Sequence, residues 1–205
     1  MVDESPNIEV LIMAAGASKR MGRAKQLLPW GHTFLLGHII QTALQLQSGH
    51  VTVVLGDHYD NIKKKIVVFP VNVVYNDEWH LGLGKSIACG IEYINQSKRD
   101  VDGVMIVLAD QPFVTPEFLN TLIKSFRSGE KVIVATSYGS NQTGVPVIFD
   151  KNYFAALLEL NDDKGAKHLL EKHKDAVRLM KTSEDMVDLD TKEVYDAMLK
   201  EAFKI

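Results

Sequence analysis

The fold is constrained most by a series of short β-branched runs, most of which are followed by a stretch of helical composition. Strands are expected at residues 10–14, 51–55, 71–75, 104–108, 131–137 and 145–149. Helices are expected at residues 33–47, 85–96, 116–128, 153–160, 164–173 and 191–203. Several strand runs are apolar at nearly every position, a pattern typical of strands covered on both faces. The alternation predicts an α/β fold: a Rossmann-like, three-layer sandwich with a mostly parallel sheet between helices.

The length of the chain and the continuity of this pattern predict a single domain over residues 1–205. A chain of 205 residues can bury roughly 70% of its unfolded surface in one core. No internal repeat, low-complexity tract or linker-like segment divides the sequence. Thr115, Pro116 and Glu117 form a strong helix start, because a capping hydroxyl, a first-turn proline and an acid all favour that end.

Charge and cysteine content exclude several classes of protein. The formal net charge is −3, so the overall composition attracts neither a nucleic-acid backbone nor an anionic membrane. The single cysteine, Cys89, excludes an internal disulfide and fits a reducing compartment. The N-terminus is acidic and unlike a signal peptide, and no apolar stretch approaches the ~18 residues of a membrane span. The expected location is the cytoplasm, without a nucleic-acid or membrane partner.

The loop after the first expected strand has an unusual composition. Ligands of open α/β sheets bind beyond the carboxyl ends of the strands, so this loop is a candidate binding segment. Gly16 and Gly22 allow the backbone to approach a ligand closely, and successive amides can form an anion-binding nest. Four basic residues fall within seven positions: Lys19, Arg20, Arg23 and Lys25. The loop suits a polyphosphate, although its composition alone also allows an exposed basic loop without a ligand.

The common phosphate-binding motifs do not describe this loop. Five residues separate Gly16 from Gly22, which fits neither Walker A nor G-x-G-x-x-G. A second segment, residues 82–86 (GLGKS), looks like the end of a Walker A motif. The earlier glycine that the motif requires is replaced there by Trp79. A P-loop is therefore not expected.

Acidic residues follow the expected strand 104–108 and precede the last expected helix. Asp110 comes at the carboxyl end of a buried strand, where a carboxylate must be hydrogen-bonded or bound to a cation. Mg²⁺ prefers carboxylates, water and phosphate oxygens, so Asp110 is a natural anchor for a metal–nucleotide complex. Asp188 and Asp190 are spaced i, i+2 and point the same way in an extended segment. Helix capping is the competing explanation for Asp190 and Thr191.

Residues 13–25 match a long pattern of one enzyme family. The pattern is L-x-A-G-x-S-x-R-M-G-x-x-K, and every element after the first is preserved, with Met13 in place of Leu. The chain resembles the MobA-like NTP transferases, most closely their molybdenum cofactor cytidylyltransferase branch. Asp110-Gln111-Pro112 is similar to the Asp-Gln-Pro of that branch. The resemblance implies a fold like that of the nucleotide-diphospho-sugar transferases.

The resemblance also implies roles for individual residues. Arg20, Lys25 and Asp110 would be catalytic, with the two basic groups neutralising phosphate charge. The nucleotide-binding set would be Ala14, Ala15, Gly16, Ala17, Ser18, Lys25, Gly82, Ser86 and Asp110. The metal would be held by Asp110 together with Asp190 or Asp188. Lys164 and Gly165, in an Asp-x-Gly-Ala segment, would lie near the acceptor.

The implied activity is Mg²⁺-dependent transfer of CMP from CTP to a phosphorylated small acceptor, with release of pyrophosphate. The acceptor implied is molybdopterin or the molybdenum cofactor, with a molybdoenzyme or its chaperone as a further partner. One alternative keeps the enzyme class but changes the substrates, for example to GTP or another metabolite. Another is a non-catalytic carrier that retains molybdenum cofactor and delivers it.

Overall fold

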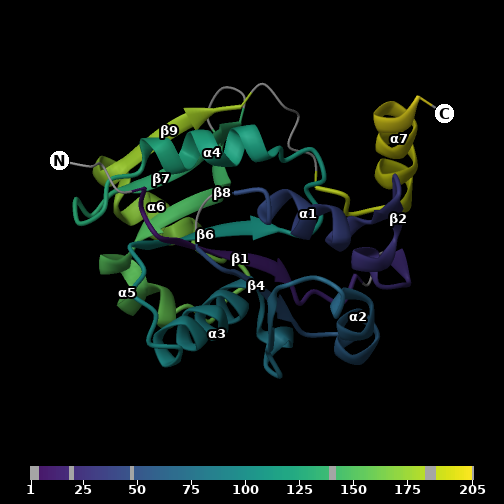
Figure 1. Ribbon diagram of the computed structural model, residues 1–205, viewed down its shortest axis with the longest axis horizontal. Coiled ribbons are helices and arrows are strands. Elements are labelled where there is room, and N and C mark those ends of the chain that lie inside the picture. The colour runs from purple at the N-terminus through teal and green to yellow at the C-terminus, as the bar shows by residue number, and fades with distance from the viewer. Residues whose placement is uncertain (1–4, 19–20, 47–48, 139–141, 183–187, 205) are drawn as a thin grey trace.

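The computed structural model describes residues 5–18, 21–46, 49–138, 142–182 and 188–204 (Figure 1). Its strands are β1 (Ile8–Ala14), β2 (Pro29–Trp30), β3 (Thr33–Phe34), β4 (Val51–Leu55), β5 (Asn72–Tyr75), β6 (Gly103–Leu108), β7 (Ile133–Tyr138), β8 (Gln142–Asp150) and β9 (Val177–Lys181). Its α-helices are α1 (Leu35–Ala43), α2 (Tyr59–Ile66), α3 (Leu83–Gln96), α4 (Pro116–Ser125), α5 (Phe154–Leu158), α6 (Lys167–Lys172) and α7 (Lys192–Phe203). Short 3₁₀ turns include η2 (Lys25–Leu27) and η3 (Trp79–Leu81).

Seven of these strands form one sheet in the order β5-β4-β1-β6-β8-β7-β9. Strand β1 pairs in parallel with both β4 and β6, and β7 pairs in parallel with β9. Strand β8 is antiparallel to both of its neighbours, β6 and β7. The sheet is therefore mostly parallel, as expected from the alternation in the sequence.

Helices cover both faces of the sheet, and the alternation within β1 shows why. Ile8, Val10 and Ile12 pack in a core with residues of α1, α2 and α4. Leu11 and Met13 pack in a second core with residues of α3, α5 and α6. Every residue of β1 is buried, since successive side chains point to opposite faces. The predicted three-layer α/β fold is confirmed.

A third, smaller cluster joins α7 to the rest of the molecule. Leu28, Trp30 and Leu35 pack there against Leu189 and Tyr195, and the Tyr195 hydroxyl donates to the Pro29 carbonyl at 2.6 Å. Figure 1 shows α7 standing beside β2, away from the main sheet. This cluster connects the segment that precedes α7 to the segment that follows Lys25.

The six expected strands are all present, with ends that differ by up to three residues. Helix α4 begins at the expected cap, since Thr115 Oγ1 accepts from the Phe118 amide at 3.2 Å. The expected helix 153–160 is shorter, because residues 151–153 form a 3₁₀ turn before α5. Helix α2, strand β9 and the β2–β3 pair were not expected as elements. Within the described residues, no helix is long and apolar enough to cross a membrane.

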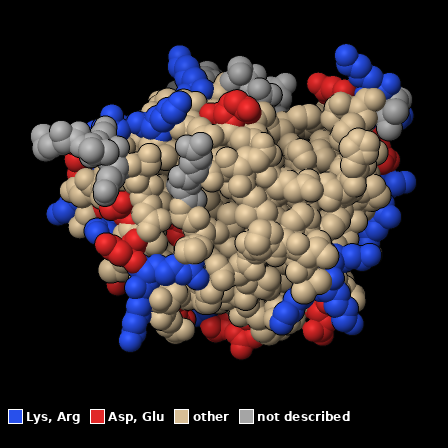
Figure 2. Space-filling view, in the orientation of Figure 1, with Lys and Arg blue, Asp and Glu red and all other residues tan. Residues whose placement is uncertain are grey.

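Charged side chains on one face of the molecule are mixed in sign. On the face in Figure 2, basic and acidic groups of the described residues alternate around the margin, and the centre is largely uncharged. A nucleic-acid backbone is normally met by a continuous basic patch or stripe. This face does not offer one.

Candidate active site

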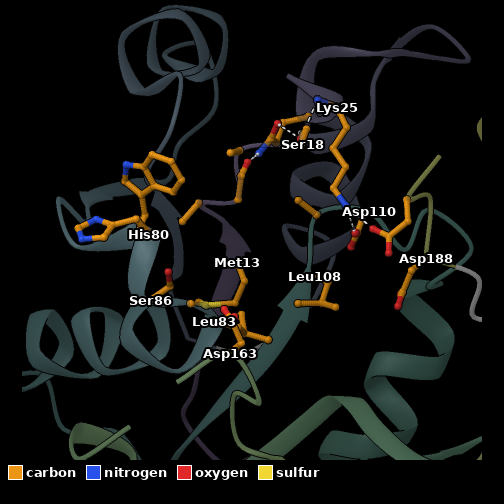
Figure 3. Close-up of a pocket in the computed structure, with 18 residues that line it drawn as sticks. Met13, Ser18, Lys25, His80, Leu83, Ser86, Leu108, Asp110, Asp163 and Asp188 are labelled. Atoms are coloured by element: carbon orange, nitrogen blue, oxygen red, sulfur yellow. Dashed lines mark hydrogen bonds and ion pairs between the residues drawn. The ribbon is translucent and has the colours of Figure 1, made fainter. Parts of the chain in front are cut away.

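Loops from several elements meet at the carboxyl ends of β1 and β6. These two strands are adjacent in register, with Met13 opposite Leu108, so the residues that follow each strand lie side by side. They line a cavity of about 670 Å³ together with the β5–α3 connection and residues preceding α7. Figure 3 shows Lys25, Asp110 and Asp188 at one side of this cavity and His80 and Ser86 at the other. This is the edge of the sheet where open α/β folds bind ligands.

The loop after β1 is held by the side chain of Gln26. This glutamine is 2% exposed, and its Nε2 donates to the carbonyls of Ala14 and Gly16, each at 2.9 Å. Ser18, at a positive φ of 52°, lies with its Oγ 3.2 Å from the Lys25 amide, from which it accepts. Because these bonds fix carbonyls and the serine hydroxyl, they also fix where the intervening amides point. The candidate residues 15–18 all line the cavity.

Lys25 extends from this loop to two carboxylates. Its Nζ is 2.5 Å from Asp110 Oδ2 and 2.9 Å from Asp190 Oδ1. Burial alone would lower the pKa of Lys25, but the charges and hydrogen bonds of Asp110 and Asp190 outweigh it and raise the pKa. The ammonium therefore stays charged and joins the basic loop to the acidic side of the cavity.

Asp188 is the third carboxylate that lines this side of the cavity. Its Oδ1 accepts from Nε2 of Gln111 at 2.8 Å. Although Asp188 is exposed as a residue, withdrawal of its carboxyl group from water and then the charge of Asp110 raise its pKa. Leu189, fully buried in the α7 cluster, donates its amide to the Asp110 carbonyl at 3.1 Å. Leu189 thus anchors the Asp188–Asp190 segment beside Asp110.

The opposite side of the cavity is built by the connection from η3 to α3. Gly82 has φ of 109°, and a Cβ there would lie 2.2 Å from Asp163 Oδ1, so only glycine fits this close approach. Ser86 is 3% exposed, and its Oγ accepts from Asn76 Nδ2 at 2.9 Å. Both residues line the cavity, as does Asp163. This half is less charged than the half that holds Lys25.

The structure brings most of the expected site residues together. The residues among them that line one cavity are Ala15, Gly16, Ala17, Ser18, Lys25, Gly82, Ser86, Asp110, Asp188 and Asp190. Ala14 ends β1 just before the loop, and Arg20 lies outside the described residues. Lys164 is exposed and Gly165 is buried against Leu83, and neither lines the cavity, which Asp163 reaches instead.

Sequence reasoning did not identify Gln26, Gln111 or Asn76, which hold the loop, Asp188 and Ser86 respectively. Gln26 and Asn76 carry no charge and belong to no quoted motif, so the only signal was their position next to Lys25 and after β5. Gln111 belongs to Asp110-Gln111-Pro112, but that motif assigned it no role of its own. Their roles depend on atoms that folding brings to them.

The fold is that of a nucleotidyltransferase, and in this chain a glycine-containing loop and an acidic cluster meet at one edge of its mostly parallel sheet. Residues 10–177 match the MobA-like NTP transferase domain, and the chain belongs to that family. The resemblance seen in residues 13–25 is confirmed at the level of the family.

One curated relative and several solved structures align over nearly the whole length of this chain. Purine catabolism protein PucB of Bacillus subtilis (strain 168) is 29% identical over 94% of this chain and 96% of its own. The crystal structure of a Mycobacterium tuberculosis Rv0371c homologue, from Mycobacterium sp. strain JC1, matches with TM-score 0.84 and 30% identity over 96% of this chain and 97% of that one. Rv0371c of M. tuberculosis H37Rv, solved in complex with manganese, matches with TM-score 0.78 and 25% identity over 95% of this chain and 98% of that one.

Proposed function

We propose that this chain is a Mg²⁺-dependent cytidylyltransferase that transfers CMP from CTP to a phosphorylated small acceptor and releases pyrophosphate. The proposed acceptor is molybdopterin or the molybdenum cofactor. The observation that carries the proposal is the contact of Lys25 with Asp110 and Asp190. It joins an amide-rich loop suited to a triphosphate to carboxylates suited to a divalent cation, within one cavity.

The donor set of the cavity fits a hard divalent cation. Three carboxylates, from Asp110, Asp188 and Asp190, line its acidic side, and an ammonium already lies between two of them. In the part of the chain that the structure describes, no group of three or more His, Cys, Asp or Glu is arranged to hold a metal unaided. Mg²⁺ commonly binds through one or two carboxylates plus substrate phosphates, so this arrangement suits a metal that arrives with the nucleotide. A bound metal would offset charge on the triphosphate.

The roles proposed for the protein's own groups are binding and charge stabilisation. The amides of residues 15–18 would bind the triphosphate, and Lys25 and Arg20 would offset charge on the phosphates and on the leaving pyrophosphate. Asp110, with Asp188 or Asp190, would hold the metal. The phosphate of the acceptor is already a nucleophile, so no strong general base is required. Catalysis would then rest on positioning and electrostatic stabilisation at the α-phosphate.

Support for CTP and for a pterin acceptor comes from the resemblance, chiefly through Asp110-Gln111-Pro112. Gly82 and Ser86 are the proposed nucleobase contacts, and Lys164 and Gly165 the proposed acceptor contacts. The manganese in the Rv0371c crystal structure supports a divalent metal in the family. The name of PucB associates that relative with purine catabolism, and fold similarity does not transfer an acceptor from one member to another.

Thermal stabilisation by CTP, GTP, ATP and UTP, each with and without Mg²⁺, tests the donor. A ligand that binds only the folded state at a hundredfold excess over Kd adds about 2.7 kcal/mol to the free energy of unfolding. A Mg²⁺-dependent shift with CTP alone is the expected result. A shift with GTP alone would keep the enzyme class and overturn the cytidylyl assignment.

Turnover then separates an enzyme from a carrier. With CTP, Mg²⁺ and molybdopterin, an enzyme releases pyrophosphate repeatedly, and that is the expected result. Stoichiometric retention of the cofactor without pyrophosphate release would overturn the enzyme assignment and favour a non-catalytic molybdenum cofactor carrier.

A further inference from the structure

Gln111 is a buried amide whose two ends have different environments. The residue is 3% exposed and follows Asp110 directly. Its Nε2 donates to Asp188 Oδ1 at 2.8 Å. Its Oε1 is buried and, among the described residues, has no hydrogen-bond partner. The side-chain amide of Gln111 therefore donates a hydrogen bond to Asp188, while its carbonyl oxygen accepts none.

Stability alone does not account for a glutamine at this position. Buried polar groups are nearly always hydrogen-bonded, and an unpaired one lowers the free energy of unfolding. A methionine would fill a similar volume without a buried carbonyl. Tyr138 neighbours the amide, and its hydroxyl is likewise buried without a partner in the described part of the chain. Gln111 lies close enough to the Tyr138 hydroxyl to lower its pKa against the effect of burial, but no hydrogen bond of normal geometry joins the two groups.

The bond to Gln111 restricts the Asp188 carboxyl group. The backbone next to Asp188 is anchored by the buried Leu189. The side chain of Asp188 can still rotate about two bonds. The donor on Oδ1, 2.8 Å away, restricts this rotation and fixes the direction of the carboxylate. Burial raises the pKa of Tyr138 to about 12, so this neighbouring hydroxyl stays neutral at pH 7.

We propose that Gln111 is a positioning residue, which holds the Asp188 carboxylate toward Asp110 for a shared divalent cation. The inference rests on the proposed function, because it assigns Gln111 a task in the metal site proposed there. Partners that orient metal-binding groups are typically worth about 10- to 100-fold in metal affinity. Gln111 itself would touch neither the metal nor the nucleotide.

The test compares Gln111→Met with the unsubstituted protein by titrating Mn²⁺ in the presence of CTP. We expect the apparent Kd for Mn²⁺ to rise about 10-fold or more, while the Tm without metal and nucleotide does not fall. Tyr138→Phe is the matched control, since it removes a buried hydroxyl beside Gln111 and leaves the Gln111–Asp188 bond; its Mn²⁺ affinity should be unchanged. A lower Tm with unchanged Mn²⁺ affinity in Gln111→Met would overturn the inference.

A double-mutant cycle with Asp188→Asn tests whether Gln111 acts through Asp188. Residues that act through one contact give effects that do not add. We expect Gln111→Met to cost much less Mn²⁺ affinity in the Asp188→Asn background, titrated to saturation. An equal loss in both backgrounds would overturn the positioning role. If the unsubstituted protein binds no Mn²⁺ in the presence of CTP, both the proposed function and the role of Gln111 are wrong. If the unsubstituted protein and Gln111→Met bind Mn²⁺ with equal affinity, only the role of Gln111 is wrong.

Discussion

At the scale of single residues, Lys25 has the most unusual surroundings. Its ammonium contacts carboxylates that come from two distant parts of the chain, Asp110 and Asp190. The divalent cation proposed above would use oxygen atoms of the same carboxylates, so the ammonium and the metal would compete for them. Binding of a metal–nucleotide complex would release the ammonium toward the phosphates. If so, the lysine would disfavour a bare metal and favour one that arrives with a triphosphate.

Lys25→Met should therefore have opposite effects on two kinds of binding. Without nucleotide, Mn²⁺ affinity should increase about 10-fold, because one charge within about 4 Å is worth more than 1.4 kcal/mol at the dielectric of a protein surface. With CTP and an acceptor, turnover should fall about 10²-fold or more, since a group that stabilises the transferring phosphate is lost. Calorimetric titration and pyrophosphate release measure the two effects.

Lys64→Met provides the control for this substitution, because Lys64 is an exposed lysine of α2. It should change neither quantity. If Lys25→Met weakened the binding of Mn²⁺ alone, the idea of competition between ammonium and metal would be wrong.

Asp188 should make the stability of the folded protein depend on pH, with a sign that its pKa shift defines. Its pKa in the folded protein is raised above the ordinary value of 3.8 by withdrawal from water and by Asp110. An acid with a raised folded pKa contributes stability that is present below pH 3.8 and is lost as pH rises through the folded value. Without metal, Asp188→Asn should match the unsubstituted Tm below pH 3.8 and exceed it slightly at pH 7. A Tm difference independent of pH would contradict this.

Residues that carry charge or belong to a long motif could be predicted from the sequence, and neutral supporting residues could not. Lys25 and Asp110 were expected to lie in one site because each follows a strand, and they are in contact. Gln26 acts through hydrogen bonds to two carbonyls and Gln111 through one to Asp188, and only the folded chain brings these groups together. Either Asp190 or Asp188 was expected to be the second metal ligand, and their hydrogen bonds differ: Gln111 donates to Asp188 and Lys25 to Asp190.

At the scale of elements, helix α7 and the segment before it complete the acidic side of the cavity. Leu189 lies between the two aspartates and is fully buried in the cluster that contains Trp30 and Tyr195. Its backbone is also bonded to Asp110. Packing in this cluster thus sets the positions of carboxylates that do not belong to the main sheet.

Leu189→Ala should affect stability and the site together. Truncation of a fully buried leucine typically costs about 2–5 kcal/mol in the free energy of unfolding, which urea denaturation measures. Mn²⁺ affinity in the presence of CTP should fall in the same variant, since its two neighbours lose their anchor. Leu179→Ala in β9, where the side chain is 54% exposed, should cost less than about 0.5 kcal/mol and leave Mn²⁺ affinity unchanged. Equal effects of the two substitutions would contradict the anchoring role of Leu189.

The elements that were not expected are those with weak local patterns. Helix α2 buries only Ile62 and Ile66, and β9 is an edge strand whose residues are half-buried or exposed. The β2–β3 pair has two residues in each strand. Strands such as β1 and β6, by contrast, are covered on both faces, which requires apolar residues at nearly every position. Strands that are buried on both faces can therefore be predicted from the sequence more readily than edge strands.

At the scale of the whole molecule, the central strands of the sheet should be the last to unfold. Strand β1 is paired on both sides and buried throughout, whereas β5 and β9 are the edges of the sheet. Amide hydrogen exchange should therefore be slowest in β1 and β6 and faster in the edge strands.

Adding CTP with Mg²⁺ should slow amide hydrogen exchange further at residues 15–18. Protection that appears only outside the cavity would contradict the proposed binding site.

The contact between Lys25 and Asp190 spans 165 residues of the chain, which has a consequence for synthesis on the ribosome. At about 5–20 residues per second, Asp190 is made roughly 8–30 s after Lys25. Asp110, 85 residues after Lys25, becomes available earlier. A nascent chain can therefore contain the loop after β1 and its first carboxylate partner, Asp110, before Asp190 is made. The contact of Lys25 with both carboxylates can therefore form only after Asp190 has been made, whereas its contact with Asp110 can form before that.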